Sequence, residues 1–210
     1  EELIIPRGDE EFFSQLPTPT PLPVVLNQPH CIPADTEGLW CFVEASNPTG
    51  TLLENITAKV SILSKDGEIL GSGIALSPLN MLPSEASIPL MIYFPSQFPE
   101  KFQATTTLYT ALPASKQKSQ IILSELDINY SSFYQKATVS GTLSVQEQSP
   151  PVQVIWVAGV AYNAEQRIVG IRKLEIENEL APGESVTFSF NIFGLEESIV
   201  DVKVIYEAHK

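Results

Sequence analysis

The chain has 210 residues, of which 43% are hydrophobic and 18% are charged, a balance typical of globular proteins and unlike that of disordered ones. Its 25 acidic and 12 basic residues give a net charge of −13, which disfavours binding to nucleic acid and to anionic lipid surfaces. No apolar run is long enough for a membrane helix, so we expect no direct membrane insertion of this chain.

The first 23 residues differ in composition from the rest of the chain. Residues 1–15 are acidic and follow no helical or strand period, and residues 16–23 alternate proline with threonine or leucine. Because proline fixes φ and lacks an amide donor, we expect an extended, semi-rigid spacer here. A spacer of this composition commonly holds a domain away from whatever precedes it, and a membrane anchor upstream of Glu1 is one candidate for that segment.

A first domain is expected over residues 24–112. Apolar residues alternate with polar ones between Ile56 and Ile62, which is the period of a half-buried strand. The Asp66-Gly67 pair then predicts a hairpin turn, because this dipeptide readily accepts positive φ. The expected strands cover residues 24–26, 30–32, 39–45, 56–62, 69–76, 88–92 and 103–112.

Residues 113–118 form a short polar linker, and residues 119–210 repeat the plan of the first domain. The expected strands of this second domain cover residues 121–128, 133–145, 152–162, 168–176, 186–192 and 199–206. No window has a convincing helical period. The sequence therefore predicts an all-β chain of two tandem immunoglobulin-like antiparallel β-sandwich domains.

The two domains are copies of one another at an offset of 99 residues. A hairpin closed by Gly71 matches one closed by Gly170, and Phe94 matches Phe193 at the same spacing. The turn at residues 82–85 likewise matches residues 181–184. A single offset for three landmarks indicates a duplicated domain.

Several motifs of the second copy carry a family resemblance. They are residues 139–143, 160–163, 167–170 and 180–185, followed by Phe188. The first copy shares them more loosely, and it has Ser84 where the pattern has glycine. These motifs resemble the FxLYD type of immunoglobulin-like domain found in secreted and envelope-attached bacterial proteins. The resemblance implies a sandwich fold and an exported location, and it implies no catalytic or cofactor-binding residues.

Two cysteines and a histidine lie close together in the first domain. Cys31 and Cys41 flank a loop, and their spacing would place them on neighbouring strands of a hairpin. We favour a disulfide between them, with two reduced core thiols as a second interpretation. A third is a copper or zinc site formed by His30 with the two thiolates, although no fourth ligand is evident nearby.

Candidate catalytic residues are few. Nucleophilic catalysis needs a base beside the nucleophile, and the histidines of the chain are His30 and His209. Neither lies in a Gly-x-Ser-x-Gly setting, and no glycine pattern that cradles phosphates is present. We therefore expect no catalytic residues and no cofactor. A histidine–carboxylate constellation in a deep cleft would contradict this interpretation.

One strand differs between the copies on one face. At the 99-residue offset a polar stripe of the first copy, residues 57, 59, 61 and 63, becomes an apolar one in the second. The apolar candidates for an interface are Val154, Trp156, Val160 and Tyr162. Since an exposed stripe of this kind costs solubility, we expect it to pack against the first domain, another copy of the chain or a partner. The alternatives are a strand buried on both sides within its own sandwich and a one-residue slip in the comparison.

These features favour a non-catalytic module of the cell exterior that acts in protein or glycan interaction or as a structural spacer. The alternative is a small-molecule or metal-binding protein, with a site at the domain junction or around His30, Cys31 and Cys41. The sequence leaves association into a homo-oligomer open.

Overall fold

The computed structural model of the chain describes residues 22–34, 37–114, 120–131, 133 and 135–209. All the regular elements of this part are β-strands, and all their pairings are antiparallel. The all-β fold of antiparallel sandwiches is thus confirmed. Residues 1–21 of the expected spacer and 115–118 of the expected linker lie outside the described residues. Within the described part, no helix is long and apolar enough to cross a membrane.

The first half, residues 22–114, is one sheet folded over into two layers. Its strands are β1 (Val25–Leu26), β2 (His30–Pro33), β3 (Leu39–Ser46), β4 (Leu53–Leu63), β5 (Ile69–Leu76), β6 (Met81–Leu82), β7 (Ser87–Phe94) and β8 (Gln103–Pro113). One layer pairs β3 with β1, β2 and β7, and the other pairs β4 with β5, β6 and β8. A single pair, Leu76 with Met91, joins β5 to β7, which is why the layers can fold onto one another.

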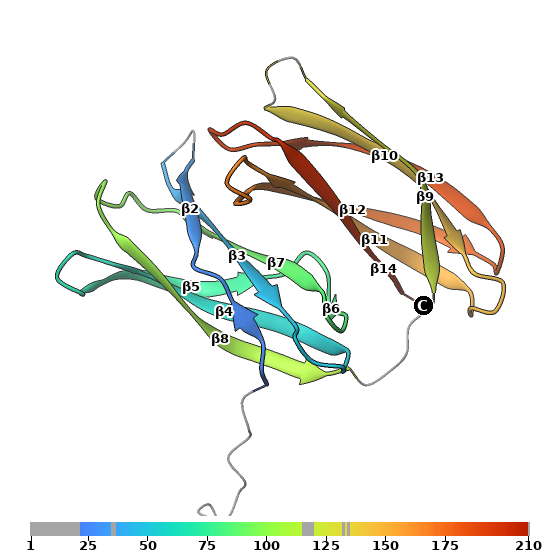
Figure 1. Cartoon of the computed structure of the whole chain (residues 1–210), viewed down its shortest axis with the longest axis horizontal. Helices are drawn as coiled ribbons and strands as arrows, with labels where there is room; N and C mark the ends of the chain where they lie inside the picture. The colour runs from blue at the N-terminus through green and yellow to red at the C-terminus, as the bar shows by residue number, and fades with distance from the viewer. Residues whose placement is uncertain (1–21, 35–36, 115–119, 132, 134, 210) are drawn as a thin grey trace, which may run out of the picture.

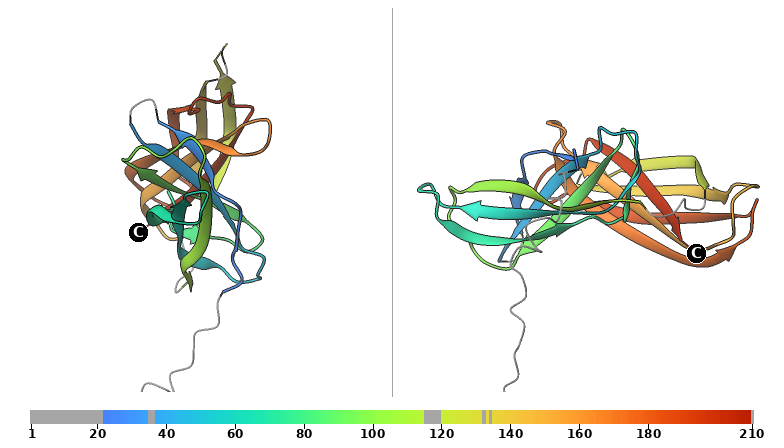
Figure 2. Two further views of the ribbon diagram at one scale, coloured as in Figure 1. Left: turned by 90° about the vertical axis from the view of Figure 1, so that its left-hand side faces the viewer. Right: turned by 90° about the horizontal axis from the view of Figure 1, so that it is seen from below.

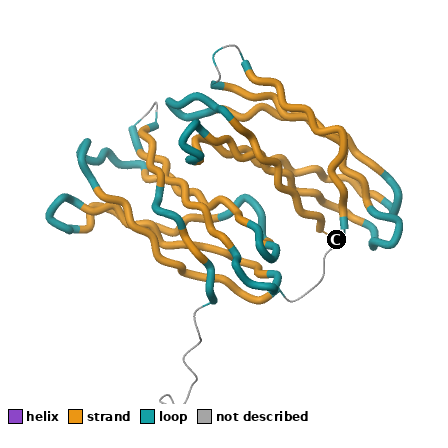
Figure 3. The backbone as a smooth tube through the Cα atoms, in the orientation of Figure 1, coloured by secondary structure: helices purple, strands orange, loops and turns teal. Residues whose placement is uncertain are grey.

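The second half, residues 120–209, is a sandwich of two separate three-stranded sheets. Its strands are β9 (Ile121–Tyr130), β10 (Lys136–Val145), β11 (Val152–Tyr162), β12 (Ile168–Leu180), β13 (Ser185–Phe193) and β14 (Asp201–His209). The sheets have the strand orders β13-β10-β9 and β12-β11-β14. Figure 3 shows the two halves side by side, each built of strands and loops.

Equivalent strands occupy equivalent places in the two halves. The central strands β4 and β11 begin and end 99 residues apart. A pair of serine hydroxyls also recurs, Ser46 with Ser87 at 2.8 Å between β3 and β7, and Ser144 with Ser185 at 2.7 Å between β10 and β13. This recurring pair matches β3 with β10 and β7 with β13, at an offset of 98 residues rather than 99.

The four layers stack in one series. From left to right in Figure 1 they are the β4 layer, the β3 layer, the sheet of β11 and the sheet of β10. Figure 2 shows the same two halves from two further directions. The β3 layer of the first half and the β11 sheet of the second half therefore face each other at the junction.

The hydrophobic core continues across this junction. One cluster, mostly from the second half, includes Ile32 and Phe42 of the first half. The other, mostly from the first half, includes Ala158 of the second, with Trp156 packed against it. Burial of apolar surface from both halves favours one joined unit.

The strand bounds differ from expectation in several places. The expected strand at 199–206 is β14, which runs on to His209 because that residue still pairs with Val154. Strand β12 extends to Leu180, beyond the expected end at Ile176, because Leu180 pairs with Val152. The two-residue strand β6 was not expected, since Met81 and Leu82 are too short a run to show a period.

Candidate functional site

Cys31 and Cys41 form a disulfide. They are direct register partners on β2 and β3, as a hairpin spacing predicts. Because both sulfurs are joined in this bond, neither is a free thiolate, and the alternative of a copper or zinc site built on thiolates is wrong. Among the described residues, no group of three or more histidine, cysteine or acidic side chains is arranged to hold a metal ion.

The apolar stripe of β11 lies on the face turned toward the first half. Trp156 packs against the core cluster of the first half, and Ala158 is buried within that cluster. Val160 and Tyr162 are buried in the cluster that also holds Phe42. Val154, at the end of the stripe, is half-buried. The structure thus brings Trp156, Val160 and Tyr162 onto the junction between the halves, whereas Val154 belongs to neither core cluster.

A matching apolar face on the first half was missed by the sequence argument. Trp40, Phe42 and Met91 lie on neighbouring β3 and β7, and all contact the cluster of the second half. When the two halves are aligned on their serine pairs, Trp40 corresponds to Thr138 and Phe42 corresponds to Ser140. The sequence comparison did not show this change, because its offset of 99 residues matches Trp40 and Phe42 with Val139 and Gly141, whereas the serine pairs are 98 residues apart.

A buried carboxylate adds a polar contact to the junction. Glu207, on β14, is 6% exposed, and its Oε2 atom accepts hydrogen bonds from the backbone amides of Asn80 and Met81. The donor–acceptor distances are 2.9 and 2.8 Å. A charged acceptor satisfies two backbone donors of the first half here, which makes the contact specific in position.

The turn between β11 and β12 projects polar side chains toward the first half. The Oδ1 atom of buried Asn163 accepts from the backbone amides of Glu165 and Arg167 at 3.1 and 2.8 Å, which fixes the turn. Gln166 has a φ of 59°, whereas the equivalent residue of the first half is Gly67, with a φ of 84°. A side chain in this left-handed region costs about 1 kcal/mol, so the second copy holds glutamine at a position that favours glycine.

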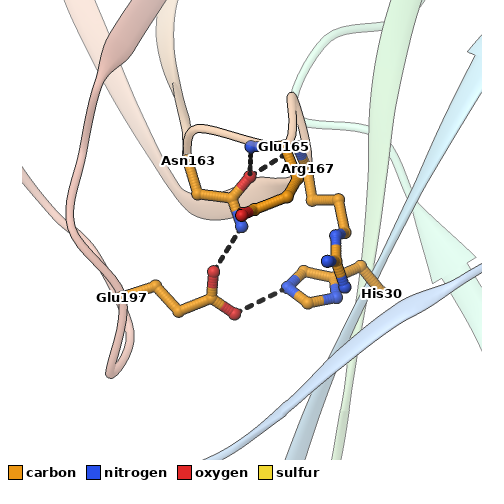
Figure 4. Close-up of polar contacts among 5 residues, drawn as sticks. All are labelled: His30, Asn163, Glu165, Arg167 and Glu197. Atoms are coloured by element: carbon orange, nitrogen blue, oxygen red, sulfur yellow. Dashed lines mark hydrogen bonds and ion pairs between the residues drawn. The ribbon is translucent and has the colours of Figure 1, made fainter.

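The same asparagine begins a hydrogen-bond chain that reaches the first half. Its Nδ2 amide donates to Glu197, and the other carboxylate oxygen of Glu197 lies 3.0 Å from His30 Nε2. Figure 4 shows this chain with Glu165 and Arg167 beside it. His30 and Glu197 are 167 residues apart in sequence, so only the docking of the halves brings them together.

His30, Glu165 and Arg167 border an open cleft of about 550 Å³ that both halves line. We call it the polar cleft; its lining residues are Asn27, Gln28, Pro29, His30, Phe42, Glu44, Glu165, Gln166, Arg167 and Ile168. Glu44 accepts hydrogen bonds from Tyr162 Oη at 3.2 Å and from Asn27 Nδ2 at 3.4 Å. Burial, together with the Glu44 carboxylate, raises the pKa of Tyr162 above its usual value of about 10, so its hydroxyl stays protonated as the donor.

The polar cleft offers groups that can hydrogen-bond a ligand. Its pair of His30 and Glu197 could transfer a proton. A histidine paired with a carboxylate in a deep cleft would contradict the expectation of a non-catalytic chain. The His30–Glu197 contact is a pair of this kind, beside an open cleft. A general base of this type needs a nucleophile or a bound water to act on. Among the described residues, no serine, threonine or cysteine side chain hydrogen-bonds His30. The second carboxylate oxygen of Glu197 accepts a hydrogen bond from Asn163.

No protein-family model matches the chain, and no curated protein matches it. Solved structures that resemble it include red sea bream transglutaminase, with 10% identity and a TM-score of 0.30 over 97% of this chain and 32% of that one. The β-glucuronidases of Bacteroides uniformis and Parabacteroides merdae are 13% identical, with TM-scores of 0.27 and 0.26 over 82% and 85% of this chain. The chain covers 26% and 30% of those enzymes, and thus spans about a third or less of all three proteins. Similarity at this level carries no inference about activity.

Proposed function

We propose that the chain is a non-catalytic binding module of the cell exterior whose polar cleft binds a glycan. The observation that carries the proposal is a cleft lined from both halves by amide, carboxylate and guanidinium groups beside the ring of Phe42. Sugars present many hydroxyls that both donate and accept, and such planar groups hydrogen-bond them in pairs. An aromatic wall beside them supplies apolar contact area.

Several of these groups are available to a ligand. The side chains of Gln28, Gln166 and Arg167 line the cleft and hydrogen-bond no other side chain in the part of the chain that the structure describes. Gln166 is the sharpest case, because glycine would fit its backbone conformation better. Keeping a side chain there at a cost in stability is typical of residues that serve binding.

The location rests on the disulfide. Bridges between cysteines persist in oxidising compartments and are rare in the cytosol. The Cys31–Cys41 bridge therefore supports an exported protein. The resemblance of the second half to FxLYD domains supports the same location, in the bacterial envelope or outside the cell.

Binding of the whole chain to a panel of neutral and acidic oligosaccharides tests the proposal. We expect retention of at least one sugar without turnover, and we expect Gln166→Gly to weaken it about tenfold without lowering stability. The control is Lys65→Ala, an exposed residue of the equivalent turn in the first half. Failure of every sugar to bind would contradict the glycan proposal, and cleavage of a retained sugar would contradict the non-catalytic one.

A second candidate function, a rigid structural spacer, is favoured by the docking of the two halves. Their facing sheets share core residues, and Glu207 is bonded across the junction. A stack of this kind would hold its ends at a fixed separation. Small-angle scattering that required a broad range of separations between the halves would contradict it.

A further inference from the structure

A second cleft lies at the junction, and its chemistry differs from that of the polar cleft. It has a volume of about 630 Å³, in the range of small-molecule sites, and Phe42 lines both clefts. We call it the apolar cleft. Trp40 and Met91 line it from the first half, and Leu174 and Phe193 line it from the second.

Its apolar walls are open to a ligand. Phe193 is 60% exposed, which is unusual for a phenylalanine, and Trp40 is only partly buried. The Trp40 ring is held in place by the Tyr93 ring, at a centroid distance of 5.0 Å. Fixed aromatic surfaces of this kind gain free energy when an apolar group covers them.

The charge in the apolar cleft is opposite in sign to the charge of the chain. None of its lining residues is acidic, although the chain has 25 acidic residues and a net charge of −13. Its single charged lining residue is Arg172. Within the described residues, no carboxylate forms an ion pair with this guanidinium. An unpaired arginine at the edge of an apolar surface fits a ligand with an apolar body and an anionic end.

We propose that the apolar cleft binds a small apolar carboxylate. The tail of the ligand packs against Trp40, Met91 and Phe193, and its carboxylate accepts hydrogen bonds from Arg172. Both halves contribute to the site, so it exists only while they are docked. The inference concerns a different cleft and a different ligand chemistry from the glycan proposal, and it stands or falls independently of that proposal.

The two methionines of the chain make a direct test, because Met91 lines the cleft and Met81 does not. The whole chain, with 13C-labelled methionine methyls, is titrated with octanoate, octan-1-ol or octylammonium, which differ in the charge of the head group. We expect octanoate to bind most tightly and to shift the Met91 methyl signal while that of Met81 stays unchanged. Octan-1-ol binding as tightly as octanoate would overturn the proposal, as would a shift of Met81 alone.

Two matched arginine variants then test whether the carboxylate of the bound ligand lies at Arg172. We expect Arg172→Gln to weaken octanoate binding about tenfold, because it removes a charge-assisted hydrogen bond. Arg167→Gln makes the same change in the polar cleft, and we expect it to leave the octanoate affinity unaltered. Equal affinities for the wild type and Arg172→Gln, or a loss confined to Arg167→Gln, would contradict the assignment.

Discussion

The carboxylate of Glu207 accepts a hydrogen bond from the backbone amide of Met81 at 2.8 Å, although 126 positions separate the two residues in sequence. Glu207 lies on the last strand of the second half, and Met81 lies on the short strand β6 of the first. The contact is buried and polar, within a junction that is otherwise largely apolar. It therefore fixes how the facing sheets are placed relative to one another.

Removing this acceptor should be costly. We expect Glu207→Ala to lower the free energy of unfolding by about 2–3 kcal/mol, because two buried backbone donors lose their partner. Glu179→Ala, on an exposed position of β12, should stay within about 0.5 kcal/mol of the wild type. Urea denaturation of the whole chain measures both variants, and equal midpoints for them would show that the contact contributes nothing.

The tryptophan of the apolar stripe should matter more than a polar residue on the equivalent face of the first half. The Trp156 ring packs against the first half, with Lys173 Nζ at 3.3 Å and the His209 ring at 4.0 Å from its centroid. We expect Trp156→Ala to cost about 2–3 kcal/mol through lost packing. Lys59 lies on the equivalent face of β4 and is exposed, so Lys59→Ala should change stability little. Thermal unfolding that is equally sensitive to both substitutions would argue against a special role for this face.

Stability should fall in alkali partly through Tyr162. Burial, with the Glu44 carboxylate, raises the pKa of this hydroxyl, so the folded chain holds its proton more tightly than the unfolded chain does. By linkage, the contribution is complete below about pH 10 and is lost as pH rises further. Tyr162→Phe removes the titrating group and keeps the ring.

The comparison is made between about pH 8 and pH 11, on either side of the unfolded tyrosine pKa. We expect the wild type to lose more stability over this interval than Tyr162→Phe. Burial lowers the pKa of Lys173, which acts in the opposite direction, but it does so in both proteins and cancels from the difference. Identical losses in the two proteins would mean that the Tyr162 hydroxyl titrates no differently in the folded chain.

The disulfide should stabilise the first half. It closes a loop with a sequence separation of 10 residues between β2 and β3. We expect the double variant Cys31→Ser, Cys41→Ser to lose about 3 kcal/mol, chiefly because the unfolded chain gains conformational freedom. Reduction of the wild type should shift its urea midpoint by a similar amount, and no shift under either treatment would contradict this estimate.

The sequence predicted the strands because each half alternates polar and apolar residues around turns. The run from Ile56 to Ile62 and the Asp66-Gly67 turn specify a hairpin without reference to the rest of the chain, and the structure contains it as β4 and β5. Strand ends were less accurate. Whether His209 continues β14 depends on its pairing with Val154, and the residues around His209 do not allow this pairing to be predicted.

The junction could be anticipated only in part. The change from a polar to an apolar stripe on β11 pointed to a covered face. The matching face on β3 was not visible, because the 99-residue offset matches Trp40 and Phe42 with Val139 and Gly141. The His30–Glu197 contact and the burial of Glu207 could not be predicted from the sequence. Each depends on how two halves dock, and an isolated glutamate near the end of an acidic chain gives no sign of it.

The central claim is that the halves dock face to face as one rigid body. Residual dipolar couplings of the backbone amides, measured separately for β3 and β4 and for β10 and β11, test it most directly. We expect one alignment tensor to fit both halves of the wild type in the orientation of Figure 1. Two tensors of different magnitude would mean that the halves move independently, and the clefts between them would then have no fixed shape.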